Sequence, residues 1–204
     1  MDYLDTFYSM VGRGFLVGAT FFLLALTYTI QPVLAFLTGK PEYVAAYPYV
    51  WLLALGTILH GMHGIIGVSL LIHKQTKAIS HSFITAALLF VAGTSLLIPW
   101  WGLWAPAGMT VVAYGYAILS IHRKAQRIRP IDFRMPSLLQ YLTICIACLS
   151  FLTWGQGQEW NNGWWLGLLT FPIMFAAVFV TGVFQWKTVP LICRRLPILV
   201  RRGI

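Results

Sequence analysis

Hydrophobic residues in this chain are grouped into long runs separated by short polar segments. A helix needs about 17 to 25 apolar residues to cross roughly 30 Å of hydrocarbon. Six runs have about that length, and they cover residues 14–38, 48–72, 82–98, 103–121, 136–154 and 163–186. The pattern predicts an all-α integral membrane protein, a polytopic bundle of six transmembrane helices in one domain covering residues 1–204.

The third and fourth runs are short and are joined by a segment that begins at Pro99 and ends at Pro106. Proline at both ends of a segment disfavours one continuous helix. A tight hairpin between two crossing helices is therefore predicted. The alternative is a re-entrant pair that does not cross the bilayer completely.

Lys and Arg residues next to membrane helices are retained on the cytoplasmic side. With six helices and a cytoplasmic N-terminus, every Lys and Arg except Lys40 falls on that side. The charge pattern thus predicts a multi-pass protein of the bacterial cytoplasmic (inner) membrane, with both termini in the cytoplasm.

The composition agrees with a membrane location, because 59% of the residues are hydrophobic and only 9% are charged. The net charge of +9 is explained by topology and by attraction to anionic lipids, without nucleic acid. The tail 187–204 is predicted to lie among lipid headgroups, either as a simple anchor or as a specific site for an acidic headgroup. Its Arg pairs are Arg194, Arg195, Arg201 and Arg202.

Acidic residues are confined to predicted loops and chain ends, at Asp2, Asp5, Glu42, Asp132 and Glu159. Intramembrane carboxylates usually mark ion paths, so a carboxylate-driven antiporter is disfavoured. Motifs for nucleotide binding, serine hydrolysis or zinc proteolysis are absent from the sequence. No catalytic residue is predicted.

One polar group lies at membrane depth, where His60-Gly-Met-His63 occupies the middle of the second run. The spacing places both imidazoles on one helix face. They are candidates for binding a b-type haem, a metal such as copper together with Met62, or a quinone or other polar ligand. The alternative is a pair of neutral histidines that hydrogen-bond across a close helix contact, with no cofactor.

Tryptophan is concentrated near the predicted outer face, and Trp100, Trp101 and Trp104 could form a cup there with Gln156 and Glu159. Such a cup would suit a cationic or amphiphilic ligand. An ordinary aromatic belt is the simpler interpretation.

Two further features have structural interpretations. Gln31 precedes Pro32 in the first run, where a kink is expected and the amide needs a polar partner. Cys145 and Cys148 form a C-x-x-C in the fifth run and are interpreted as small packing residues.

Three hypotheses on function follow. A transporter or ligand-binding membrane protein would have a cavity around His60, His63 and Gln31 that opens toward the Trp-rich face. An accessory subunit of a membrane complex would have a filled core and a lateral groove or oligomer interface, and the Gly14-x-x-x-Gly18 spacing fits homo-oligomers. A haem or quinone redox protein ranks third.

Overall fold

The computed structural model of the chain describes residues 2–38, 46–128, 133–157 and 164–183, and every regular element in these ranges is a helix. The prediction of an all-α protein is confirmed for this part of the chain. The elements are α1 (Asp2–Thr38), α3 (Tyr47–Ile66), α4 (Val68–Ile72), α5 (Thr76–Trp101), α6 (Trp104–Ile128), α7 (Met135–Gly157) and α8 (Trp164–Val180).

Five of these helices, α1, α3, α5, α6 and α7, are long and apolar enough to cross a membrane. This is the architecture of a multi-pass membrane protein. The predicted sixth span corresponds to α8, which has 17 residues and contains the apolar stretch Leu169–Val180. That span extends beyond the described residues, so a sixth crossing remains a prediction.

Several helices extend beyond the apolar runs predicted from the sequence, and one predicted helix is divided. The helix that contains the first predicted span, 14–38, begins at Asp2, so the residues before the apolar run are also helical. The second predicted helix is divided into α3 and α4 at Gly67, whose backbone N–H donates to the carbonyl oxygen of His63 at 2.8 Å.

The α5–α6 connection is the tight hairpin that the two prolines predict. Only Gly102 and Leu103 separate the helices, and the backbone N–H of Gly102 donates to the Ile98 carbonyl oxygen at 2.9 Å. With 26 and 25 residues, α5 and α6 are each long enough to cross the bilayer. These lengths favour two crossing helices over a re-entrant pair.

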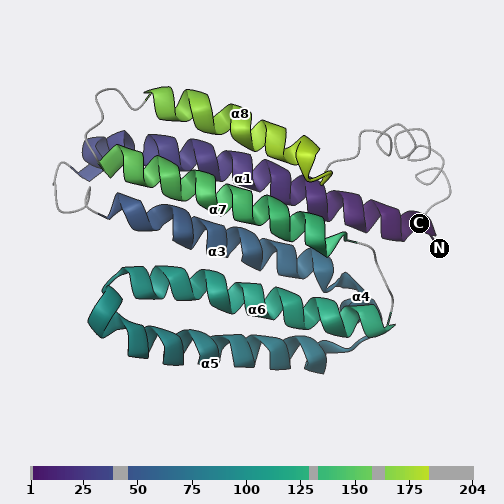
Figure 1. Cartoon of the computed structure of the whole chain (residues 1–204). Coiled ribbons are helices and arrows are strands. Elements are labelled where there is room, and N and C mark those ends of the chain that lie inside the picture. Colours follow the sequence, from purple (N-terminus) through teal and green to yellow (C-terminus); the bar gives the residue numbers. More distant parts are fainter. Residues whose placement is uncertain (1, 39–45, 129–132, 158–163, 184–204) are drawn as a thin grey trace.

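The long helices lie side by side and alternate in direction (Figure 1). Helix α5 packs on α6, α6 on α3, and α3 on α1, while α7 and α8 pack on each other and on α1. The main core joins α1, α3 and α7, and its fully buried side chains include Leu24, Leu55, Ile66, Tyr141 and Leu149. Helix α5 lies at the edge of this arrangement.

Charge and tryptophan occupy opposite ends of the described bundle. The basic residues fall near the start of α1, in the α4–α5 connection, in the first turn of α5, in the last turns of α6 and just before α7, at Arg13, Lys74, Lys77, Arg123, Lys124, Arg127 and Arg134. Alternating helix directions bring these segments to one end (Figure 1). Trp100, Trp101 and Trp104 surround the α5–α6 turn at the other end.

Candidate functional site

The two histidines of α3 lie on the helix face that looks toward α5 and α6. Their three-residue spacing places them one turn apart on that face. Met62 lies on a different face, where it is only 3% exposed and belongs to the main core. Gly61 faces α1, and a Cβ there would lie 2.7 Å from Cζ of Phe15.

The imidazoles are part of a four-ring cluster that joins three helices. The His60 and His63 rings are stacked with centroids 5.2 Å apart. Phe83 of α5 presents an edge-to-face contact to His63 at 4.4 Å, and Tyr114 of α6 lies 5.0 Å from His60. His60 remains exposed and His63 half-buried, so both rings are accessible from outside the core.

A hydrogen bond within α3 fixes the orientation of one imidazole. Nδ1 of His63 lies 2.8 Å from the backbone carbonyl oxygen of His60. A carbonyl oxygen can only accept, so Nδ1 is the protonated donor and the ring is anchored to its own helix.

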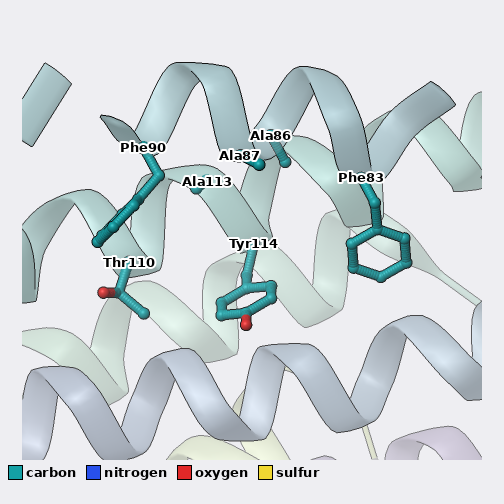
Figure 2. Close-up of a pocket in the computed structure, with 7 residues that line it drawn as sticks. All are labelled: Phe83, Ala86, Ala87, Phe90, Thr110, Ala113 and Tyr114. Atoms are coloured by element: carbon teal, nitrogen blue, oxygen red, sulfur yellow. The ribbon is translucent and has the colours of Figure 1, made fainter. Parts of the chain in front are cut away.

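A cavity of about 250 Å³ lies next to these rings, between α5 and α6. We call it the α5–α6 groove, and its lining residues are Phe83, Ala86, Ala87, Phe90, Thr110, Ala113 and Tyr114. Figure 2 shows Phe83 and Phe90 reaching from α5, and Thr110 and Tyr114 from α6, around the same space. The three alanines leave room between these larger side chains. Because most of the lining is alanine and phenylalanine, the groove is mainly apolar.

Close contact between α3 and α6 holds the histidines beside the groove. A Cβ at Gly56 would lie only 2.5 Å from Cγ2 of Thr110, so the two helices approach at a distance that only glycine permits. Gly56 and His60 are four residues apart and therefore share a face of α3. The contact sets the position of the imidazoles relative to α6.

The Trp-rich end contains two further hollows. The first, which we call the Trp hollow, measures about 470 Å³ and is lined by Leu52, Trp100, Trp101, Trp104 and Gly108. The second measures about 350 Å³ and lies between α3, α6 and α7, where it is lined by Tyr47, Pro48, Trp51, Trp104, Ser150, Thr153 and Trp154. The three tryptophans proposed from the sequence to form a cup therefore line one hollow.

The Trp hollow and the α5–α6 groove lie at neighbouring levels along α6 but on different faces of it, because helical residues two apart point about 200° away from each other. Gly108 lines the former and Thr110 the latter, and two helical residues span about 3 Å. On α3, Leu52, Gly56 and His60 recur every fourth residue and so lie along one face. His60 and Leu52, which lines the Trp hollow, therefore share a face of α3.

Other candidate residues lie elsewhere. Phe15 of α1 is level with Gly61, and Gln31 lies 16 residues, or about 24 Å, further along the same helix. The structure therefore does not bring Gln31 to the histidines. The side chain of Gln156 is not described, and Glu159, Arg194, Arg195, Arg201 and Arg202 lie outside the described residues.

Metal and thiol chemistry find little geometric support in the part of the chain that is described. No group of three or more His, Cys, Asp or Glu residues is close enough there to hold a metal ion, and Met62 points away from the imidazoles into the core. Cys145 and Cys148 are free and buried. Beside them, the Tyr141 hydroxyl and Thr20 Oγ1 are hydrogen-bonded at 2.7 Å.

The sequence did not reveal the partners of the histidines. Phe83, Ala87 and Phe90 recur at helical spacing on one face of α5, but this pattern does not differ from ordinary packing. Only the packing of α6 between α3 and α5 brings Phe83 and Tyr114 to the histidines.

Known proteins offer no comparison for this arrangement. No family model, curated protein or solved structure matches the chain. Its function must therefore be inferred from the geometry of the site.

Proposed function

We propose that this chain is a membrane protein that binds a lipophilic molecule, as a ligand-binding or transport protein, in the α5–α6 groove with its polar end at His60 and His63. The observation that carries the proposal is that Phe83 and Tyr114, which line this largely apolar cavity, are also aromatic neighbours of the stacked imidazole pair. Binding sites typically combine an apolar lining with a few polar groups that orient the ligand.

The Trp-rich end of the bundle is the second feature that supports the proposal. The Trp hollow lies at the end of the bundle where Trp100 and Trp101 are exposed, and Leu52, which lines it, shares a face of α3 with His60. Tryptophan is favoured at the membrane–water interface. A ligand that extends from the histidines past Phe90 would therefore reach the level of the headgroups, which is the path that a transported amphiphile would follow.

The proposed topology has six crossings in the bacterial cytoplasmic membrane, with both termini in the cytoplasm. Five helices of sufficient length and the grouping of the described basic residues at one end support it. In this orientation the Trp hollow faces outward. The basic tail would contact anionic lipids on the inner face.

The proposal is tested by filling the groove. Ala87 lines the groove and is exposed, so Ala87→Trp would occupy the cavity without opening the core. Protein purified in mild detergent is extracted, and its lipophilic molecules are quantified by mass spectrometry. We expect a molecule other than bulk phospholipid to co-purify with the wild type. Its amount should be at least fivefold lower in Ala87→Trp, which corresponds to a loss of about 1 kcal/mol or more of binding free energy.

Ala92→Trp is the matched control, because Ala92 is also exposed on α5 but lies about 140° around the helix from Ala87. It should retain the molecule. Equal retention by all three proteins would refute binding in the groove, even if a lipophilic molecule is present.

A second candidate function, an accessory subunit of a membrane complex, is favoured by the exposure of α5. Only 11% of the most apolar part of α5 is buried, against 39% for α3 and α6. Such a helix has room for a partner helix as well as for lipid. Photo-crosslinking from Leu88, which is 65% exposed on α5, distinguishes the two, because a complex would give one discrete protein adduct.

A further inference from the structure

Beside the α5–α6 groove, where Phe83 contacts both imidazoles, His63 has a defined hydrogen-bonding character. Nδ1 of His63 is committed as a donor to the His60 carbonyl oxygen. In a neutral imidazole the second ring nitrogen then carries the lone pair, so Nε2 of His63 can accept a hydrogen bond but cannot donate one. A ligand at this nitrogen must supply a donor.

The shape of the groove beside the histidines favours a flat ring. Phe83 and Tyr114 both line the groove and both contact His60, with centroid distances of 6.0 and 5.0 Å. Aromatic rings pack well on one another in stacked and edge-to-face arrangements. A ligand ring in the groove would have aromatic neighbours from α5 and α6.

The rest of the groove is suited to a hydrocarbon chain. Ala86, Ala87 and Phe90 of α5, with Ala113 of α6, present no polar side-chain atom to the cavity. Apolar surface of this kind binds a chain through burial alone. A flat ring, a hydrogen-bond donor and a hydrocarbon chain together describe one class of lipophilic molecule.

We infer that the ligand is a quinol-type lipid: a hydroxylated aromatic ring whose OH donates to Nε2 of His63 and whose apolar chain lies along Ala87 and Phe90. This inference rests on the proposed function and specifies the ligand of that site. The oxidised quinone has carbonyl oxygens in place of hydroxyl groups and offers Nε2 no donor. The site should therefore prefer the reduced form by about tenfold, as expected for loss of one hydrogen bond at an otherwise unchanged contact.

The test uses the full chain in nanodiscs of phosphatidylethanolamine and phosphatidylglycerol. The probes are decylubiquinol kept reduced under argon, decylubiquinone and dodecanol. Ligand retained by immobilised discs is measured at equilibrium, and retention by empty discs is subtracted. We expect decylubiquinol to bind about tenfold more tightly than decylubiquinone, and dodecanol to bind more weakly than either because it lacks a ring.

His63→Phe keeps an aromatic ring in the cluster and removes the acceptor. It should bind decylubiquinone as the wild type does and lose the preference for decylubiquinol. His81→Phe is the matched control, because His81 is exposed on α5 and lies about 200° around that helix from Phe83. This control should keep the full preference.

Several results would overturn the inference. Equal binding of the reduced and oxidised probes by the wild type would do so without any variant, and so would an unchanged preference in a folded His63→Phe protein. Dodecanol binding as tightly as decylubiquinol would show that a hydroxyl group suffices. A haem absorption band that is lost in His63→Phe would assign Nε2 to iron instead.

Failure of this inference is distinguishable from failure of the proposed function. If no probe binds, but Ala87→Trp still removes a co-purifying lipophilic molecule, the ligand class is wrong and the groove remains a binding site. If Ala87→Trp removes nothing and no probe binds, both proposals fail.

Discussion

At the scale of single residues, helix packing in this protein depends on positions where a neighbouring side chain occupies the space of a missing Cβ. The space beside Gly56 is occupied by the methyl group of Thr110, and the space beside Gly61 by the ring of Phe15. The two differ in rigidity, since a β-branched threonine on a packed helix has little freedom to move. Gly56 is therefore the more sensitive position.

Gly56→Ala should lower the free energy of unfolding by about 1 to 3 kcal/mol, because overpacking forces α3 away from α6. Thermal unfolding in detergent can be followed with a thiol-reactive dye, since Cys145 and Cys148 are free and buried. Adding Thr110→Ser should restore much of the loss, because the nearest remaining contact, Thr110 Cβ, lies at an acceptable 3.4 Å.

Gly64→Ala provides the control for this prediction, because a Cβ there meets nothing within 4 Å. It should leave stability unchanged or raise it slightly through helix propensity. A Gly56→Ala protein as stable as the Gly64→Ala protein would contradict the close α3–α6 contact.

At this scale the sequence identified part of the site. The i, i+3 spacing placed both imidazoles on one face of α3, and Trp100, Trp101 and Trp104 do line one hollow. Gln31 was expected near the histidines, but the length of α1 carries it about 24 Å away from their level. Phe83 and Tyr114 could not be found, because the order in which helices pack is not encoded in local spacing.

At the scale of elements, the α5–α6 hairpin depends on one unusual backbone position. Gly102 has φ +52° and ψ −130°, which is near the first central position of a type II′ turn and is favourable only for glycine. At the other end of the hairpin, Lys124 of α6 donates to Ser82 Oγ at 2.9 Å and to the Ala78 carbonyl oxygen at 3.1 Å. The turn and these bonds fix the two ends of the hairpin, between which α5 packs along α6.

Gly102→Ala should destabilise the hairpin by about 1 to 3 kcal/mol, because an L-residue is strained at this φ and ψ. Gly115→Ala is the control, since Gly115 is helical and a Cβ there has open space. The thermal midpoint and the yield of folded protein both report the loss. Identical midpoints for the two variants would mean that the turn adapts without strain.

Element-level prediction from sequence was reliable where a physical signal marked the boundary. Pro99 and Pro106 indicated the turn between α5 and α6, and the apolar runs located each long helix that the structure describes. The helix that contains the first predicted span begins earlier, at Asp2, because amphipathic residues before the apolar run continue the helix without belonging to that run. The break at Gly67 was missed because an isolated glycine does not by itself end a helix.

At the scale of the whole molecule, the described charges and the tryptophan cluster separate along the helix direction. Alternating helices bring Lys74, Lys77 and the last turn of α6 to one end, and the α5–α6 turn to the other (Figure 1). Such a separation is the structural form of the positive-inside rule. It gives the proposed orientation a direct test.

In a cysteine-free background, Leu103→Cys should react with an impermeant maleimide in intact cells, since Leu103 is 64% exposed in the α5–α6 turn. Arg127→Cys, at the opposite end of α6, should react only after the cells are permeabilised. The reverse labelling would invert the orientation. Reaction of both residues in intact cells would show that α6 does not cross the bilayer.

The position of the α5–α6 groove, beside a helix that is mostly exposed to hydrocarbon, determines how occupancy should be measured. A ligand would arrive by diffusion within the bilayer, so its mole fraction in lipid, and not its aqueous concentration, governs binding. Diluting a sample with buffer should leave occupancy nearly constant, whereas fusing in empty vesicles should reduce it. Affinities compared between laboratories would agree only when expressed per lipid.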